Sequence, residues 1–400
     1  MLDPSKSCCT GCGACYSICP KQCILMEQDN EGFLYPVIDE ANCTKCEKCG
    51  IICPAIVQGM ARRVLNVYAA KNHDEEIRHQ SSSGGIFSLL AGAVIQEGGV
   101  VFGARFNDAW EVIHDYTETI EGLATFRGSK YVQSVTRDTY KQTREFLENN
   151  RKVLYSGTPC QIAGLKAFLQ KNYDNFLTID FVCHGVPSPL VWKKYLSEVI
   201  ESMNMQHISN INFRDKSHGW KDFHFVVTSD ESKAECKFIE TLSRNSFMKG
   251  FLRNLYLRPS CHDCPVKLLK SGSDITIADY WGIQNVLPEF DDDKGVSLVM
   301  INTSKGKNIY SFLDKDDHET NYAEALIGNS HIEESSLPHK KRVMFFDKLH
   351  TEPVILLIDR FTVDSVWVWL RRLMILLLHR LGLLVFIELF FKKIKGYKKT

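Results

Sequence analysis

Apolar residues follow two periodicities across the middle of the chain, between about residues 64 and 302. Short runs rich in β-branched and aromatic residues predict strands at 64–70, 152–155, 176–182, 273–278 and 296–302. Longer stretches with apolar residues at helical spacing predict helices at 86–96, 138–149, 161–170, 189–201 and 242–255. Strands that alternate with helices in this way favour an α/β sheet with crossover helices.

Other segments of this region predict antiparallel pairing. Residues 99–106 and 110–116 are strand-like runs joined across Asn107-Asp108, which favours a hairpin. Residues 208–213 and 223–228 form a second, more antiparallel portion. We therefore expect a mixed-sheet α/β domain over residues 64–341.

The first 60 residues instead carry one cysteine spacing twice. The two runs are Cys9-x-x-Cys12-x-x-Cys15-x-x-x-Cys19-Pro20 and Cys43-x-x-Cys46-x-x-Cys49-x-x-x-Cys53-Pro54. This is the spacing of bacterial two-cluster ferredoxins, in which three thiolates of a run bind one cubane and the fourth binds the other. The sequence predicts one [4Fe–4S] cluster on Cys9, Cys12, Cys15 and Cys53, and a second on Cys19, Cys43, Cys46 and Cys49.

Zinc binding and a disulfide framework are the alternatives for these runs. Zinc sites favour separated Cys-x-x-Cys pairs rather than two four-cysteine runs. Disulfides would need export, and Met1 to Ser7 lacks the apolar core of a signal peptide. Fifteen cysteines therefore indicate a reducing, cytoplasmic compartment, and oxygen-sensitive clusters suggest an anaerobic or microaerobic host. Cys8 and Cys23 fall outside the repeat and are interpreted as plain thiols.

Composition limits the number of domains and the classes of partner. The chain has 400 residues, enough for two or three units, and 44% are hydrophobic, as in an ordinary globular core. Lys and Arg number 48 and Asp and Glu also 48, so no net field would attract nucleic acid. We expect no nucleic-acid partner.

Four further cysteines follow predicted strands or helices at chain turns: Cys160, Cys183, Cys261 and Cys264. Together they would suit a third [4Fe–4S] cluster. The alternative is two unrelated buried cysteines plus a small zinc or thiol pair. His184, beside Cys183, would tune or shuttle protons, or serve only the structure.

Two more loops have a functional and a structural interpretation. No G-x-G-x-x-G occurs, so a nicotinamide-binding Rossmann unit is unsupported. The structural interpretation of the loop at Ser83-Gly84-Gly85 is a flexible segment or a helix cap. The loop from Phe213 to Trp220 concentrates charge and aromatic rings. It would be either a solvated turn or a contact for an anionic substrate.

At these loops the chain resembles the beta subunits of coenzyme F420 hydrogenases and dehydrogenases, in the form with an N-terminal two-cluster ferredoxin. The resemblance extends from Cys9 to about Asn302. It is carried by Ser83-Gly84-Gly85-Ile86, Gly128-Ser129-Lys130-Tyr131, Gly157-Thr158-Pro159-Cys160-Gln161, Cys183-His184-Gly185, Phe213-Arg214-Asp215-Lys216, Arg258-Pro259-Ser260-Cys261-x-x-Cys264 and Asp274-Ile275-Thr276-Ile277-x-Asp279.

The resemblance implies FAD in the α/β domain with a cluster close to it, and so favours the third cluster. The residues that it places around the flavin are Ser83, Gly84, Gly85, Lys130, Gly157, Thr158 and Gln161. Lys130 and His184 are the candidate catalytic side chains. The family includes deazaflavin oxidoreductases, a chlorophyll-derivative reductase and bacterial proteins, some of which accompany surface-polysaccharide pathways.

The C-terminal segment, residues 342–400, changes character. Leu373 to Phe391 is a strongly apolar run of 19 residues, nominally long enough to span a bilayer, but it contains His379, Arg380 and Glu388. A basic end follows, and the pattern favours an amphipathic helix at a membrane surface. A domain-packing or dimer helix is the alternative.

The patterns predict a ferredoxin domain over residues 1–60, an α/β domain over 64–341 and a helical tail over 342–400, and the resemblance implies that the α/β domain holds FAD and an iron–sulfur cluster. The function expected is that of a flavin-dependent iron–sulfur oxidoreductase. It would pass electrons between a ferredoxin-type carrier, or a redox partner subunit, and an organic or deazaflavin (coenzyme F420-like) small-molecule substrate. The alternative is a relay and docking subunit of a larger membrane-associated redox complex. Both fit a cytoplasmic protein, peripheral at the inner face of a membrane.

Overall fold

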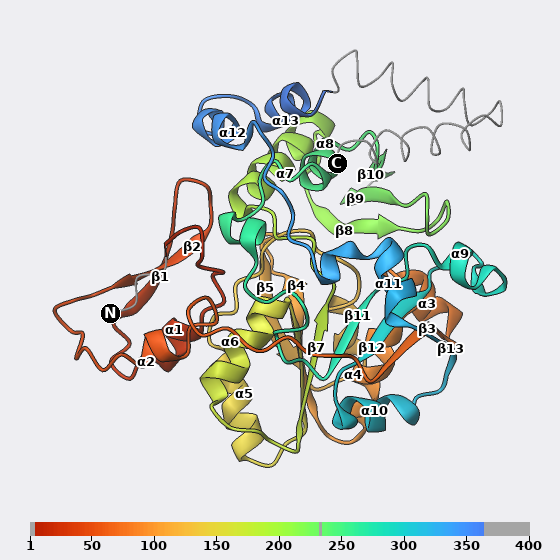
Figure 1. Ribbon diagram of the computed structural model, residues 1–400. Coiled ribbons are helices and arrows are strands. Elements are labelled where there is room, and N and C mark those ends of the chain that lie inside the picture. The colour runs from red at the N-terminus through yellow and green to blue at the C-terminus, as the bar shows by residue number, and fades with distance from the viewer. Residues whose placement is uncertain (1–4, 232–233, 364–400) are drawn as a thin grey trace, which may run out of the picture. The chain divides into compact units, whose positions relative to one another are not determined.

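The computed structural model describes residues 5–231 and 234–363. The chain divides into two compact units, residues 1–358 and 359–400. The first unit holds the cysteine runs and the α/β region, and its elements are labelled in Figure 1. The helix and basic end predicted from residue 373 onward lie outside the described residues. No helix within the described ranges is long and apolar enough to cross a bilayer.

An antiparallel hairpin and two short helices make up the N-terminal part. Their order is α1 Ala14–Ile18, β1 Ile24–Gln28, β2 Leu34–Ile38 and α2 Lys48–Ile51. Each helix follows a residue with positive φ, Gly13 before α1 and Glu47 before α2. These two residues occupy the same place in their cysteine runs, one position after the second cysteine. The two runs therefore fold alike, as their common spacing predicts.

The α/β region is built on an eight-stranded mixed sheet in the order β13-β3-β12-β11-β7-β6-β4-β5. Strands β4, β6, β7 and β11 pair in parallel, and the flanking pairs are antiparallel. The bounds are β3 Asn66–Asn72, β4 Val100–Phe106, β5 Val112–Thr117, β6 Val153–Gly157, β7 Phe176–Phe181, β11 Ile275–Asp279, β12 Ser297–Ile301 and β13 Lys315–Thr320. The predicted mixed sheet is confirmed, but β13 was not predicted.

Alternate side chains of the central strands enter different cores. On β6, Leu154 packs with α4 (Ile86–Gln96) on one face. Val153 and Tyr155 pack with α5 (Thr139–Glu148) and α6 (Pro159–Leu169) on the other. These helices cover the sheet in Figure 1. The loops after β6, β7 and β11 open at the carboxyl edge of the parallel strands, where open α/β sheets usually bind ligands.

A three-stranded antiparallel sheet lies between two helices in the sequence. The elements are α7 Pro189–Met203, β8 Ile208–Asp215, β9 His224–Glu231, β10 Ala234–Thr241 and α8 Ser246–Leu252. The pairing of β8 with β9 is confirmed, whereas β10 was not predicted. The helix predicted at 242–255 is wrong in its extent, because Asn245 caps α8 by accepting a hydrogen bond from the Met248 N–H.

The remaining elements are short. They are α3 Glu75–Gln80, α9 Ile283–Val286, α10 Ser304–Ser311, α11 Tyr322–Gly328, α12 Arg342–Lys348 and α13 Val354–Thr362, with 3-10 turns at Glu121–Thr125, Pro259–Asp263, Pro288–Phe290 and Ser330–Ile332.

The N-terminal part is packed onto the α/β region. The Ser188 hydroxyl donates to the carbonyl oxygen of Glu31, and the Glu31 carboxylate pairs with Arg342 at 2.9 Å. Gly32, at φ +87°, lies so close to Leu190 that a β-carbon on Gly32 would collide with it. The hairpin turn is thus fixed by a hydrogen bond, an ion pair and a close approach that only glycine allows.

Candidate metal centres and cofactor cavity

The thiols predicted for the first cluster, Cys9, Cys12, Cys15 and Cys53, lie together beside α1. Burial raises the pKa of Cys12 to about 12 against a hydrogen bond from Ala14, and the nearby thiols act in the same direction as burial. Burial and the same neighbours also raise the pKa of Cys15. Buried thiols of this kind become thiolates only when cations share their charge. The donor set therefore fits a cluster.

The thiols predicted for the second cluster surround a cavity of about 120 Å³, which Cys19, Cys43, Cys46 and Cys49 all line. Cys23 lines it too, with its Sγ 3.4 Å from the Cys19 Sγ. The hydrogen bond with Cys19 and burial raise the pKa of Cys23 to about 11. Because Cys23 falls outside the repeat, its position beside these thiols could not be read from the spacing.

The third set of thiols surrounds a cavity of about 50 Å³, lined by Cys160, Cys183, Cys261 and Cys264. Cys160 lies in the first turn of α6, which begins with a capping box made by Thr158 and Gln161. Burial raises the pKa of Cys160 to about 11 and that of Cys261 to about 12. The structure thus brings the four predicted residues to one place, and their role as cluster ligands stays a prediction.

Among the described residues, no three His, Cys, Asp or Glu side chains converge as ligands of a single metal ion. The ligands of a [4Fe–4S] cluster need not converge on one ion, because four cysteines hold a group of four irons.

A third cavity, at about 640 Å³ larger than the two described above, lies at the carboxyl edge of the parallel strands. This volume is in the range of cofactor sites. Of the residues predicted around a flavin, it is lined by Ser83, Gly85, Lys130, Gly157, Thr158 and Gln161. Gly84 is instead pressed against the sheet, and its N–H donates to the Ser297 hydroxyl at 3.0 Å.

The large cavity adjoins the third set of thiols. Residues 182–186 and His331 line both cavities. Cys183 therefore stands in the wall between the thiols and the larger space. Cys12 of the first set is in turn an electrostatic neighbour of Cys160. The first and third thiol sets and the cavity form a continuous series.

His114 on β5 is a cavity residue that the sequence did not indicate. Its Nε2–H donates to the carbonyl oxygen of Ser156 at 3.0 Å, which leaves Nδ1 as an acceptor. That Nδ1 is buried and has no partner among the described residues. Burial lowers the pKa of His114 to about 4, so the ring is neutral near pH 7. A ligand that donates a hydrogen bond would satisfy it.

Arg214 on β8 places a buried positive charge at the same cavity. Its guanidinium donates to both carboxylate oxygens of Asp279, at 2.9 and 3.2 Å, and to the Tyr131 hydroxyl. Its Nε is buried without a partner in the described part of the chain. Although burial opposes the charge, Asp279 and Tyr131 raise the pKa of Arg214. The alternative that this loop is a solvated turn is wrong for Arg214, because its side chain is buried.

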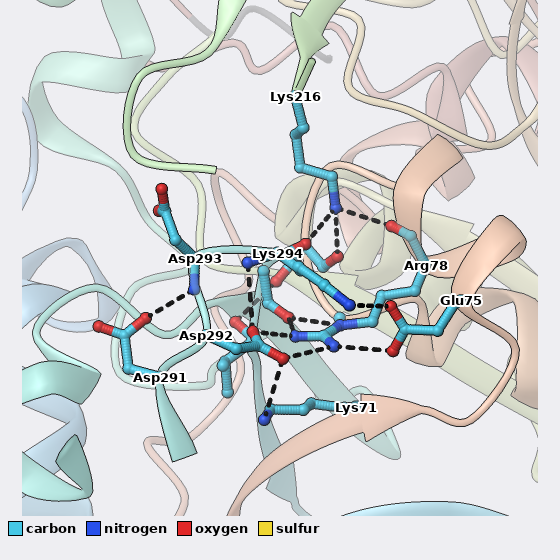
Figure 2. A network of polar contacts seen from close by, with 12 residues as sticks. Lys71, Glu75, Arg78, Lys216, Asp291, Asp292, Asp293 and Lys294 are labelled. Carbon is cyan, nitrogen blue, oxygen red and sulfur yellow. Dashed lines mark hydrogen bonds and ion pairs between the residues drawn. The ribbon is translucent and has the colours of Figure 1, made fainter. Parts of the chain in front are cut away.

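Lys216, two residues later, holds the Ser83–Gly85 loop. Its Nζ donates to the carbonyl oxygens of Arg78, Ser83 and Lys294 at 2.7, 3.0 and 2.7 Å. The buried Arg78 guanidinium pairs with Asp292 and donates to the carbonyl of Gly295. Figure 2 shows Lys216, Arg78 and Asp292 within this network of polar contacts.

The two candidate catalytic side chains have their polar atoms engaged. Lys130 Nζ donates to the carbonyl oxygens of Thr125, Arg127 and Gly128, and burial lowers its pKa to about 7. His184 Nε2 lies 2.6 Å from Asn254 Oδ1 and His184 Nδ1 lies 2.7 Å from His331 Nε2.

The Asn254 amide fixes the hydrogen-bonding direction at His184. Its Nδ2 donates to the carbonyl oxygen of Leu337 at 2.8 Å, so its Oδ1 accepts from His184 Nε2–H. His184 Nδ1 lies 2.7 Å from His331 Nε2, and the other ring nitrogen of His331, Nδ1, lies 3.3 Å from the carbonyl oxygen of Glu334, which can only accept. Burial lowers the pKa of His184 to about 4.

Comparison with known proteins matches two parts of the chain to protein families. Residues 150–324 match the family described as the C terminus of the coenzyme F420 hydrogenase/dehydrogenase beta subunit. Residues 8–57 match the 4Fe-4S dicluster domain.

Two individual proteins are also similar. An uncharacterized ferredoxin of Methanocaldococcus jannaschii is 39% identical over 54 residues, which are 14% of this chain and 66% of the ferredoxin. A chain of the xenon-derivatized F420-reducing [NiFe] hydrogenase complex from Methanosarcina barkeri is 18% identical, with a TM-score of 0.44 over 72% of this chain and 91% of that chain.

Proposed function

We propose that this chain is a flavin-dependent iron–sulfur oxidoreductase. Its residues 150–324 belong to the family of F420 hydrogenase/dehydrogenase beta subunits, and its residues 8–57 form a 4Fe-4S dicluster domain. It carries electrons between a ferredoxin-type carrier and a small organic or deazaflavin substrate. Its clusters are held by the two predicted ferredoxin sets and by Cys160, Cys183, Cys261 and Cys264.

The observation that carries this proposal is the shared wall between the third thiol set and the large cavity. Cys183 and His184 line both spaces, and the cavity has the volume of a cofactor site. An electron on a cluster at these thiols would need to cross only the wall to reach a cofactor. A bound FAD would exchange the single electrons of the clusters for a two-electron step on substrate.

Polar groups of the cavity support a polar heterocycle such as FAD as its ligand. Arg214 and Asp279 line the cavity as a buried ion pair, and the Arg214 Nε has no partner within the described part of the chain. His114 Nδ1 supplies an acceptor. Buried groups left unpaired in this way are costly unless a ligand or water completes them.

Proton transfer to substrate is assigned to the two candidate catalytic residues. Burial lowers the pKa of Lys130 to about 7, which suits proton exchange near neutrality once its Nζ leaves the carbonyl oxygens of Thr125, Arg127 and Gly128. Burial holds His184 neutral, and because Asn254 and His331 engage its two ring nitrogens, it must release one of them before it exchanges a proton with substrate. Both side chains line the cavity.

The second thiol set is proposed as the entry point from the carrier. Cys46 is exposed, and Ile51 and Met60 nearby in the sequence expose 64% and 86% of their surface. A redox partner subunit would use the same surface if the chain serves only as a relay.

An anaerobic count of iron, acid-labile sulfide and flavin per purified chain tests the proposal. About twelve irons and one FAD are expected from three four-iron clusters and one flavin. About eight irons with FAD would remove the third thiol set from the cluster ligands. Eight irons without flavin would favour the relay role and contradict the enzyme.

A further inference from the structure

We infer that Arg258 is a shared counter-charge for two neighbouring clusters, the first ferredoxin cluster and the cluster on the third thiol set. The inference rests on the proposed function, because that function supplies the second of these clusters. In this role Arg258 is a positioning residue that acts on electron energies and touches no substrate.

Arg258 is fully buried, with a relative exposure of 0%, between the two thiol sets. Its Nε donates to the carbonyl oxygen of Cys9 at 2.7 Å, and its Nη2 lies 3.6 Å from the Cys9 Sγ. On the other side it lines the cavity of the third thiol set. It is an electrostatic neighbour of Cys160 and Cys261.

The remaining contacts of Arg258 are neutral. Nη1 donates to the Gln133 side-chain oxygen at 3.0 Å, and Nη2 donates to the carbonyl oxygen of Leu34 at 2.9 Å. The Tyr35 ring lies 4.3 Å from the guanidinium carbon. No carboxylate pairs with Arg258 among the described residues. A fully buried charge without a counter-ion is strongly disfavoured, so another anion must balance it.

Cluster thiolates are the anions nearest to it. A four-cysteine cluster carries net negative charge, and its reduction potential depends on net charge, hydrogen bonds to sulfur and solvent access. Arg258 contributes to all three at the first cluster, since it is cationic, faces the Cys9 sulfur and excludes water. It contributes its charge at the third thiol set as well.

The consequence concerns a single electron moving between the two clusters. The electron leaves one reduced cluster and arrives at the other cluster, which is oxidised; no bond or proton changes, and the carrier supplies the electron at the start. Arg258 lies near the electron both before and after this step. The positive charge therefore raises both reduction potentials together and keeps them close, where a one-sided charge would separate them.

Charge and contact can be tested separately at Gln133, whose side chain accepts a hydrogen bond from Arg258. Gln133→Glu places a carboxylate beside the guanidinium and neutralises its field, whereas Gln133→Met removes the hydrogen bond and adds no charge. Arg258→Lys keeps the charge, and Arg258→Met removes it. Arg105→Gln is a control, because Arg105 pairs with Asp115 on the β4–β5 hairpin.

The measurement is an anaerobic redox titration of the purified full chain, followed by electron paramagnetic resonance, with iron content and circular dichroism for each variant. We expect Gln133→Glu and Arg258→Met to shift two cluster potentials to more negative values. Gln133→Met, Arg258→Lys and Arg105→Gln should leave them near those of the unchanged protein.

Three outcomes would overturn the inference. If Gln133→Glu retains its iron and its fold with unchanged potentials, Arg258 does not set them. If a single potential moves, the charge is not shared. If the unchanged protein holds about eight irons, the third cluster is absent and the shared role of Arg258 falls before any variant is compared, while the flavin content of the same sample decides the proposed function separately. Should Arg258→Met lose its fold, the Gln133 pair alone decides the question.

Discussion

Gly164 of α6 lies so close to Cys12 that a β-carbon on Gly164 would be 2.8 Å from the Cys12 Sγ. Cys160 lies one turn earlier on the same helix. One helix therefore reaches both the first and the third thiol sets, and the absence of a side chain at position 164 lets them approach.

Gly164→Ala should disturb the first cluster. The added methyl group must displace the Cys12 sulfur or the helix, and overpacking of this kind costs about 1–3 kcal/mol. We expect lower iron content and a lower melting temperature. Gly92→Ala in α4 is the matched control, since the nearest atom to a β-carbon there is 3.9 Å away. It should stabilise the helix by up to about 1 kcal/mol. Equal iron content in both variants would contradict the expectation.

Serine substitution distinguishes cluster ligands from other thiols. Cys183→Ser should reduce the iron content from about twelve to about eight per chain, because one ligand of the third set is lost. Cys236→Ser, on β10, should change nothing, as Cys236 belongs to none of the three thiol sets. Both are measured by iron analysis and absorbance. Full iron content in Cys183→Ser would show that the third set holds no cluster.

His114 should make the protein less stable in mild acid. Its folded pKa, about 4, lies below the ordinary value of 6.5, so the unfolded chain binds a proton between these values and the folded chain does not. The contribution of His114 to the free energy of unfolding is complete above pH 6.5 and falls as the pH drops toward 4. The loss reaches roughly 1–2 kcal/mol at pH 5.

The measurement for His114 is urea unfolding of the holoprotein at pH 7 and pH 5, under anaerobic conditions. His114→Gln should flatten the pH dependence by this amount. A variant with the same pH dependence as the unchanged protein would rule out a neutral, buried His114.

Lys216→Met should weaken flavin binding. The substitution leaves the carbonyl oxygens of Arg78, Ser83 and Lys294 without a charged donor, at a cost of about 1–3 kcal/mol, and frees the loop that lines the cavity. Lys294→Met is the control, because the Lys294 side chain is 59% exposed and pairs with the exposed Glu75. Such surface pairs contribute about 0–1 kcal/mol. Flavin retention after gel filtration should fall only in Lys216→Met.

Spacing and strand order made much of the site predictable. The eight ferredoxin cysteines lie on a repeat, and the four thiols of the third set follow central strands or helices, so topology brings them to one edge. His114, Arg258 and Cys23 have no such signal. A single histidine on a strand carries no motif, and the buried state of Arg258 depends on contacts with Cys9 and Leu34 more than 200 residues away. The extent of α8 depends on one capping asparagine.

The contacts that join the N-terminal part to the α/β region also constrain how the holoprotein is assembled. Arg258 is closed in by the Cys9 and Leu34 carbonyls, and the Glu31 turn is held by Ser188 and Arg342. Thr10 of the N-terminal part lines the cavity of the third thiol set, whose other side adjoins the large cavity. Docking of the N-terminal part therefore closes one route by which a cluster could reach Cys160, Cys183, Cys261 and Cys264, and leaves the route through the large cavity.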